Sequence, residues 1–597
     1  MTDRIVKIGG ASGFWGVSCV GPSQLVELGN VDYLVFDYLA ELTMSVLAAA
    51  RLKNPELGYA TDFVTVAMKT VLKDVVAKGI RVVSNAGGMN PQACARALQQ
   101  VAQEQGLTVR IAVVEGDDVM PLIPGLRSQG VKEMQSGQPL PESLISANAY
   151  LGAVPIRQAL DDGAQIVITG RCVDSAVTLG VLMHEFKWQA DDYDRLAQGS
   201  LAGHMIECGC QATGGLHTDW ESVPDWYDIG YPVLECSADG SFTVCKPEGT
   251  GGLVSVATVS EQLLYEIGDP ASYMLPDVIC DFTVVQIVQT DINRVAVRGA
   301  RGRAPTAFYK VSATYANGFR CTAQLTIVGL DAVPKARRTA DAILARTRRL
   351  FAAQGWGDYS ATHIDVLGSE SCYGPHAAAP QIREAIMRLA VTHPNKSALA
   401  LFAREIAPAG TSWSPGTTGS GGGRSGVSAS IRQFAFLLPK SALTPVVVEG
   451  DQRAVVNLPA PANATYAAAE TASVAPAPVA ARAPAGDTID VPLIKLVWGR
   501  SGDKGDISNI GLIARKPSYL PYLRHALTPE RVRAWLAHLV KGSVTRYDLP
   551  GIDAMNFVCE QALDGGGMAS LRNDPLGKGM AQILLAMPVT MPVSELK

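Results

Sequence analysis

His204 and Glu207 stand three residues apart, a spacing that places both side chains on one face of a helix. An imidazole beside a carboxylate suits proton transfer, and it also suits metal binding. Cys208 and Cys210 follow at once, but two cysteines this close do not form a regular disulfide. A buried histidine with only a structural role is the alternative. We predict that His204 and Glu207 are catalytic residues.

Three carboxylates occur within four residues at Glu115, Asp117 and Asp118. Crowded carboxylates shift one another's pKa or share a cation, so a divalent metal and a general base are both open here. A solvated loop that caps the next helix is the structural alternative. No His or Cys is adjacent, which disfavours zinc. We predict that Asp117 and Asp118 take part in catalysis.

Arg171 and Asp174 belong to a Gly-Arg-Cys-Val-Asp segment at residues 170–174. A guanidinium suits bidentate binding of a carboxylate or a phosphate. Asp174 suits a role as its partner or as a helix cap. We include both residues among the predicted catalytic groups.

Three further segments suit ligand binding. The glycine-rich run at 9–16 lets a phosphate approach the backbone, although it departs from Gly-x-Gly-x-x-Gly and a tight turn is the alternative. The amides at 85–90 suit a carbonyl or an anion, and Asn90 before Pro91 also suits a helix cap. The charged loop around Asp503 suits a ligand, an ion-pair turn or a docking contact. The predicted binding residues are Gly9, Gly10, Ser12, Gly13, Asn85, Gly87, Gly88, Asn90, Asp503 and Lys504.

The elements that position these residues are short apolar runs separated by helical stretches. Runs of this kind are typical of parallel strands buried on both faces. Ligands bind at the carboxyl ends of such strands, where the loops named above begin. We therefore predict that the loops converge on one pocket, with His204 and Glu207 on its wall. The runs are Ile5–Ile8, Arg81–Ser84, Ile111–Val114 and Ile166–Ile168.

The pattern along the chain predicts four regions. Residues 1–230 alternate strand and helix and form an α/β core domain with a mainly parallel sheet. We expect this sheet to be doubly wound, and a barrel is the alternative. Residues 231–451 form an α+β region packed on the core. Residues 452–488 are rich in Ala and Pro and form an extended linker. Residues 489–597 form a small ferredoxin-like α+β domain.

Bulk properties exclude several classes of protein. The 597 residues are too many for one core, and the formal net charge of −5 argues against general nucleic-acid binding. No apolar run reaches the length of a membrane span, and a charged start that enters a strand at once predicts no signal peptide. Eleven sparse cysteines indicate reduced thiols. We expect a cytoplasmic homo-oligomer with no membrane or nucleic-acid partner.

Many motifs in one order resemble the acyclic terpene utilisation protein AtuA family, and Trp498–Arg515 resembles the ferredoxin-like domain often fused to it. The resemblance implies a place in bacterial catabolism of citronellol- and geraniol-type terpenoids through acyl-CoA intermediates. It implies a small acyl-CoA-type ligand, with a CoA thioester as substrate or ligand. The motifs are Lys7–Gly16, Asp32–Thr43, Asn85–Pro91, Val114–Asp118, Ala147–Gly152, Gly170–Asp174, Gly203–Gly215 and Lys246–Gln262.

Two functions follow as hypotheses. The first is an enzyme, a lyase or hydratase, that acts on a branched acyl-CoA or its carboxylated derivative by hydration, proton transfer or C–C cleavage. The second is a non-catalytic acyl-CoA-binding or scaffold subunit that serves neighbouring enzymes. The dinucleotide-binding fingerprint of dehydrogenases is missing from the sequence, which disfavours redox chemistry with NAD.

Overall fold

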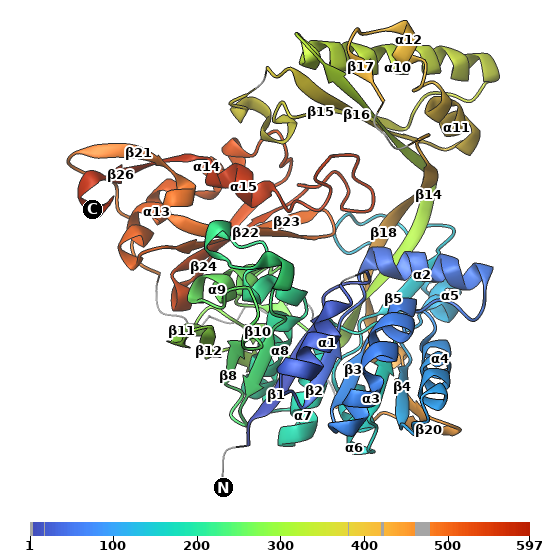
Figure 1. Ribbon diagram of the computed structural model, residues 1–597, viewed down its shortest axis with the longest axis vertical. Coiled ribbons are helices and arrows are strands. Elements are labelled where there is room, and N and C mark those ends of the chain that lie inside the picture. Colours follow the sequence, from blue (N-terminus) through green and yellow to red (C-terminus); the bar gives the residue numbers. More distant parts are fainter. Residues whose placement is uncertain (1–3, 17, 380, 420–422, 460–477, 597) are drawn as a thin grey trace.

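A mixed sheet of eleven strands organises the N-terminal body (Figure 1). The computed structural model describes residues 4–16, 18–379, 381–419, 423–459 and 478–596, and the sheet is counted within these ranges. Its strand order is open, from β11 at one edge to β20 at the other, so the described strands form a sheet and not the barrel that the sequence left as an alternative.

Five neighbouring strands in the middle of this sheet run parallel, as the apolar runs predict. In sheet order they are β1 (Val6–Ser12), β2 (Tyr33–Phe36), β3 (Arg81–Ser84), β6 (Ile166–Thr169) and β4 (Ile111–Glu115). Antiparallel strands extend both edges. They are β7 (Val233–Cys236), β8 (Phe242–Cys245), β12 (Arg294–Arg298) and β11 (Gln286–Asp291) beside β1, and β19 (Val446–Glu449) and β20 (Gln452–Val455) beside β4.

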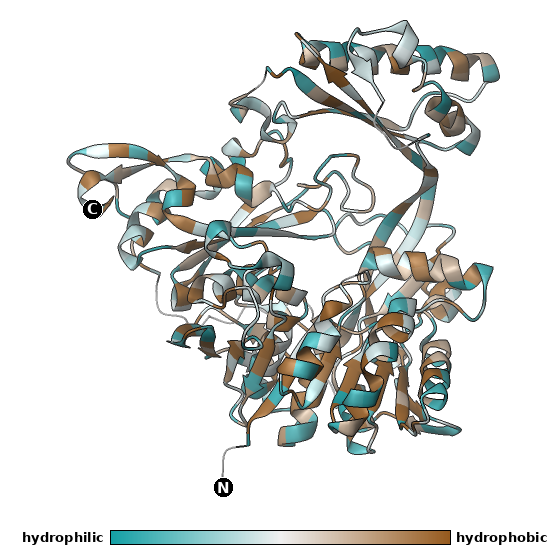
Figure 2. Ribbon diagram, in the orientation of Figure 1, coloured by the Kyte–Doolittle hydropathy of each residue, from teal (hydrophilic) through white to brown (hydrophobic). Residues whose placement is uncertain are grey.

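Both faces of the sheet are buried, and each face has its own apolar core. Neighbouring residues of a strand point to opposite faces, so Val35 and Leu34 enter different cores. The apolar strands stand out in the lower part of Figure 2. One core takes α1 (Val20–Leu28), α3 (Lys69–Ala77) and α4 (Pro91–Glu104), and the other takes α6 (Val154–Asp161), α7 (Ala176–Phe186) and α8 (Tyr193–Ile206).

Strand β1 is longer than the apolar run that marks it. The sequence predicts that it ends at Ile8, but the strand continues through Gly9 and Gly10 to Ser12. A Cβ on Gly9 would lie 3.0 Å from the Leu25 side chain, and one on Gly10 would lie 2.7 Å from the backbone oxygen of Ile206. Glycine at these positions lets helices α1 and α8 approach the strand closely.

A long hairpin joins the N-terminal body to a second sheet. Strand β14 (Phe308–Val328) pairs with β18 (Val427–Pro439) along most of its length. Near its start β14 also pairs with β5 (Ser146–Ala149) of the N-terminal body, and further along it pairs with β16 (Glu384–His393). The second sheet also holds β15 (Ala361–Leu367), and it packs against α10 (Ala332–Gln354) and α11 (Lys396–Arg404), as Figure 1 shows at the top.

The expected boundary at residue 230 does not coincide with an edge of the first sheet. Strands β7, β8, β11, β12, β19 and β20 lie beyond residue 230 and extend that sheet. The expected linker at 452–488 begins inside β20, and residues 460–477 of it lie outside the described residues.

The C-terminal domain is an antiparallel sheet with its own core. Its order is β22 (Val497–Lys504), β23 (Ile507–Ala514), β25 (Ala554–Cys559) and β24 (Val544–Leu549). Asp503 and Lys504 lie within β22 and not in a loop after a strand, because the chain turns only at Gly505 and Asp506. The helices are α13 (Leu520–Ala526), α14 (Pro529–Trp535) and α15 (Met580–Leu585), and β21 (Thr488–Pro492) pairs with β26 (Pro588–Pro592).

Candidate active site

A cavity of about 370 Å³ lies where the N-terminal body, the long hairpin and the C-terminal domain meet. The loops after β2 and β6 and the end of α8 line it from the N-terminal body. Strand β14 lines it with Phe308 and Lys310, and β22 lines it with Lys504. Of the residues predicted from sequence, five line this cavity: Arg171, Asp174, His204, Glu207 and Lys504.

His204 and Glu207 form a hydrogen-bonded pair at the end of α8. His204 Nδ1 lies 2.8 Å from Glu207 Oε1, and His204 Nε2 lies 2.9 Å from the backbone oxygen of Gln262. Only 3% of the His204 side chain and 14% of the Glu207 side chain are exposed. Both imidazole nitrogens are therefore engaged, and Glu207 is the more accessible member of the pair.

The environment raises the pKa of both groups. Burial opposes a charge on His204, but the adjacent Glu207 carboxylate outweighs it and raises the pKa of His204. Burial raises the pKa of Glu207, and His204 opposes that rise. A carboxyl whose pKa is raised toward neutrality suits proton transfer at physiological pH.

Arg171 is held by three contacts at the end of β6. Its Nη1 donates to the backbone oxygen of Leu39 at 3.0 Å and to Asp174 Oδ1 at 2.8 Å. Its Cζ lies 4.2 Å from the centre of the Tyr150 ring. The Tyr150 hydroxyl donates to Glu41 Oε1 at 2.6 Å. Burial opposes the charge of Glu41, but Lys310 and Arg171 outweigh it and lower the pKa of Glu41 to about 2.

Asp117 lies one layer beneath the cavity. Its Oδ2 accepts hydrogen bonds from Asn148 Nδ2 at 2.8 Å and from the backbone N–H of Arg171 at 2.9 Å. Burial raises the pKa of Asp117 to about 6. Asp117 thus positions the Arg171 loop and does not line the cavity.

The other two carboxylates of that segment point elsewhere. Asp118 is exposed, and its Oδ1 accepts from the backbone N–H of Met120 at 2.9 Å. Glu115 pairs with Arg453 at 2.9 Å. The three carboxylates diverge because β4 ends at Glu115 and the chain turns at Gly116, whose φ is +112°, before it reaches Asp117 and Asp118. Within the described ranges, no group of three His, Cys, Asp or Glu side chains is placed to hold a metal ion.

The predicted amide cluster stabilises the edge of the sheet beside the cavity. Asn85 Oδ1 accepts from the backbone N–H of Tyr38 at 2.8 Å, and its Nδ2 donates to the buried Asp37. Asn90 is the N-cap of α4, and its Nδ2 donates to the backbone oxygens of residues 55 and 57. Neither amide lines the cavity.

The predicted glycines and Ser12 are also engaged by the protein itself. A Cβ on Gly87 would lie 2.5 Å from the backbone oxygen of Thr169, and one on Gly88, whose φ is +51°, would lie 2.4 Å from Leu47. A Cβ on Gly13 would lie 2.6 Å from the backbone of Cys208. Ser12 Oγ donates to the backbone oxygen of Asp37 at 2.8 Å. Gly9, Gly10, Ser12, Gly13, Gly87 and Gly88 are not among the cavity-lining residues.

Two lysines of the C-terminal domain hold Glu266 at the cavity. Lys504 Nζ lies 3.0 Å from Glu266 Oε2, and Lys578 Nζ lies 2.8 Å from Glu266 Oε1. Lys578 also contacts Asp503 Oδ1 at 2.9 Å and the Tyr265 hydroxyl. Burial opposes the charge of Glu266, but the two lysines outweigh it and lower its pKa.

Glycines on β22 and β23 let this domain dock closely. A Cβ on Gly511 would lie 2.4 Å from Leu264, the last residue of α9 (Val256–Leu264), and one on Gly502 would lie 2.4 Å from Glu266. Asn509 Nδ2 donates to the Leu264 oxygen at 2.7 Å, and its Oδ1 accepts from the Glu266 N–H at 3.0 Å. This contact carries Lys504 into the cavity.

Several cavity residues escaped the sequence analysis. Glu41 directly follows the loop after β2, so the rule that places ligands at strand ends gives a signal for it. Lys310 and Glu266 lie outside the sequence motifs, and Tyr150 lies within one, Ala147–Gly152, that shows no chemical role for it. Only the tertiary fold brings these residues to one place.

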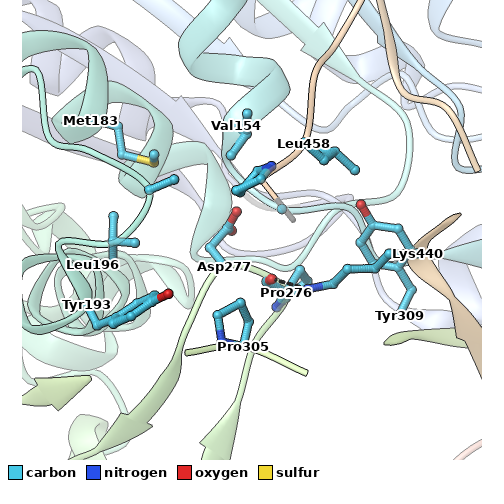
Figure 3. Close-up of a pocket in the computed structure, with 13 residues that line it drawn as sticks. Val154, Met183, Tyr193, Leu196, Pro276, Asp277, Pro305, Tyr309, Lys440 and Leu458 are labelled. Carbon is cyan, nitrogen blue, oxygen red and sulfur yellow. Dashed lines mark hydrogen bonds between the residues drawn. The ribbon is translucent and has the colours of Figure 1, made fainter. Parts of the chain in front are cut away.

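A smaller pocket of about 40 Å³ adjoins the cavity and shares Pro276 with it (Figure 3). Lys440 Nζ donates to the Pro276 backbone oxygen at 2.6 Å. Asp277 Oδ2 accepts from the backbone N–H of Ala153 at 2.8 Å, next to the first turn of α6. These bonds fix the polar groups of this pocket, and its other walls are mainly apolar.

Two family models match this chain. The model described as "Acyclic terpene utilisation family protein AtuA" matches residues 6–448. The chain belongs to the AtuA family. A model of the AtuA ferredoxin-like domain matches residues 491–590, which confirms the fold predicted for the C-terminal region. No curated protein and no solved structure matches the chain.

Membership of the AtuA family confirms the resemblance read from the motifs and assigns the chain to acyclic terpene utilisation. The cavity joins residues from the regions matched by both models, because Lys504 lies in the second region and the other charged wall residues lie in the first. In the described part of the chain, no helix combines the length and the apolar character needed to cross a membrane.

Proposed function

We propose that this AtuA-family chain is an enzyme that acts on a branched acyl-CoA thioester, or on its carboxylated derivative, by acid–base chemistry. Glu207 is the acid–base residue and His204 is its positioning residue. The observation that carries the proposal is the hydrogen-bonded His204–Glu207 pair on the wall of the cavity. Family membership supplies the class of pathway, acyclic terpene utilisation.

The hydrogen bonds of His204 restrict where the proton of the pair resides. The backbone oxygen of Gln262 is only an acceptor, so His204 Nε2 carries a hydrogen. The remaining nitrogen, Nδ1, shares its proton with Glu207. A proton that Glu207 takes from a ligand is stabilised by this arrangement, and a proton that Glu207 gives up is replaced through it.

The rest of the cavity suits an acyl group. Its volume of about 370 Å³ lies within the range of small-molecule sites, roughly 300–1,000 Å³. Leu275, Phe308 and Leu437 supply apolar wall for a branched chain. Arg171 lines the same cavity with a guanidinium that is oriented by Asp174 and Tyr150.

These groups support one chemical step that hydration, proton transfer and C–C cleavage share. Glu207 removes or returns a proton next to the thioester carbonyl, and the negative charge develops on the carbonyl oxygen. A fixed guanidinium stabilises such a charge in a site that excludes bulk water. Arg171 is placed to supply that stabilisation.

Glu207→Gln tests the proposal, with Glu261→Gln as the matched control. Glu261 pairs with His217 at 2.7 Å, so it is a second buried His–Glu pair, and it does not line the cavity. Binding of CoA and of several branched acyl-CoAs is measured by thermal shift, and conversion is followed by mass spectrometry. We expect Glu207→Gln to keep ligand binding and to lower turnover by about 10²–10⁴-fold.

The control separates chemistry from folding. Glu261→Gln is expected to lower the melting temperature while turnover per folded molecule is retained. Equal turnover by Glu207→Gln and the wild-type chain contradicts the assignment of Glu207. Tight acyl-CoA binding by the wild-type chain without any conversion favours the non-catalytic binding subunit instead.

A further inference from the structure

Lys310 presents its amine to the cavity from a rigid strand. It lies on β14, opposite Leu437 of β18, and its backbone oxygen accepts from the Tyr150 N–H at 3.0 Å. Pairing on both sides fixes the backbone. The side chain lines the cavity beside Phe308 and Glu41.

The amine of Lys310 differs from the other cations of the cavity. Arg171 is bonded to Asp174, and Lys504 is bonded to Glu266. Among the interactions of the described residues, Lys310 Nζ has neither a hydrogen bond nor an ion pair, and it lies 5.3 Å from the centre of the Tyr150 ring. The Arg171 guanidinium contacts the same ring at 4.2 Å. The lone pair or the proton of this amine is therefore left for a ligand.

Burial and two neighbouring cations outweigh the nearby carboxylates and favour the neutral form of Lys310. Burial lowers the pKa of Lys310, and Lys504 and Arg171 lower it further, whereas Glu41 and Asp174 oppose the change. A larger share of this amine is therefore uncharged at neutral pH than for a lysine in water. Desolvation and a neighbouring cation are the two conditions that activate a lysine as a nucleophile.

We propose that Lys310 is an amine nucleophile that forms an imine with the carbonyl carbon of a ketone or aldehyde ligand. The nitrogen lone pair adds to the carbonyl carbon and gives a carbinolamine. The carbinolamine hydroxyl takes a proton, leaves as water, and the iminium of Lys310 remains. A carboxyl group lining the cavity, such as protonated Glu207, supplies that proton.

This inference goes beyond the proposed acid–base step, because a thioester carbonyl does not form a stable imine. It names a different electrophile, a ketone or aldehyde carbonyl, for the same cavity. The two proposals share Glu207 as the acid, but the imine is detected as a covalent modification of Lys310 itself. Its test therefore needs no acyl-CoA turnover.

Reductive trapping on the full-length chain tests the inference. The chain is treated at pH 7 with acetone and sodium cyanoborohydride, whose hydride converts an imine to an isopropyl amine. Peptide mapping then gives the labelling rate of each lysine. Lys73, which is exposed on α3, is the internal reference. We expect Lys310 to be labelled several-fold faster than Lys73, since a lowered pKa raises the fraction of neutral amine at pH 7.

Lys310→Arg is the matched variant, because it keeps the positive charge that Glu41 faces and cannot form an imine. Circular dichroism and the melting temperature show whether it is folded, and the fast-labelled peptide is expected to disappear in it. The comparison of Lys310 with Lys73 in the wild-type chain tests the inference even if the variant does not fold. Labelling of Lys310 no faster than Lys73 overturns the inference, and Lys310 then serves as a charged partner of Glu41.

Discussion

Asp117→Asn tests the link between burial and charge directly beneath the candidate site. Asp117 is 5% exposed, and burial raises its pKa to about 6 in the folded chain, against about 3.9 in an unfolded chain. Between these values the folded state holds a proton that the unfolded state has released. The stability that comes from the protonated form is thus fully present below about pH 4 and is lost as the pH rises through about 6.

The size of the effect follows from the two pKa values. A difference of about 2 pKa units corresponds to about 3 kcal/mol of lost folding free energy at neutral pH. About half of it, roughly 1.5 kcal/mol, develops between pH 5 and pH 7.5. Asparagine retains an oxygen for the Asn148 and Arg171 donors and does not ionise. The stability of Asp117→Asn relative to the wild-type chain is therefore expected to rise by that amount over this pH range.

Calorimetry at pH 5 and pH 7.5 measures this change as a difference in melting temperature. A change of 1.5 kcal/mol corresponds to about 3 °C, using about 2 °C per kcal/mol for a large domain. Asp118→Asn removes one negative charge from the exposed neighbour and is the control. If the difference between Asp117→Asn and the wild-type chain is the same at both pH values, burial does not control the charge of Asp117.

Two predictions concern close packing and docking. Gly170→Ala is expected to lower the melting temperature by several degrees, because a Cβ would lie 2.4 Å from Asp117 Oδ1. Gly125→Ala is its control, because a Cβ on Gly125 would meet no heavy atom within 4 Å. Equal melting temperatures for the two variants would refute the clash. Arg515→Ala removes two hydrogen bonds to Asp219, of 2.6 and 2.7 Å. It is expected to cost about 1 kcal/mol or less, since this pair is partly exposed, and to speed hydrogen exchange in β22 and β23; unchanged exchange counts against a docking role.

The parallel core of the fold follows directly from the sequence. Continuous Val/Ile runs identify the strands, and the rule for strand ends places Arg171 and Asp174 at the cavity. The same rule does not distinguish Asp117 from Asp118, because both follow β4 and only the fold of the loop buries one and exposes the other. It also does not show that β1 continues through its glycines, because the need for glycine comes from helices distant in the chain.

Some charged residues of the cavity lie outside the motifs. They could not be predicted from the sequence, and the reason is the same for each of them. Lys310 becomes a cavity residue only because β14 pairs with β5 of the N-terminal body. Glu266 becomes one only because Lys504 and Lys578 arrive from another domain. Contacts of this kind are set by tertiary packing, and a single sequence carries no local periodicity for them.

The docking of the C-terminal domain and the charge of the cavity depend on each other. Gly502 and Gly511 let the sheet approach the end of α9, and Asn509 then fixes the backbone at Glu266. In that position Glu266 bonds Lys504, and Lys504 is one of the cations that lower the pKa of Lys310. Loosening the domain therefore removes a positive charge from the cavity wall, raises the pKa of the Lys310 amine and lowers its reactivity. Loss of the distant Arg515–Asp219 contact is thus expected to slow reductive labelling of Lys310, while the two apolar cores of the N-terminal sheet remain folded.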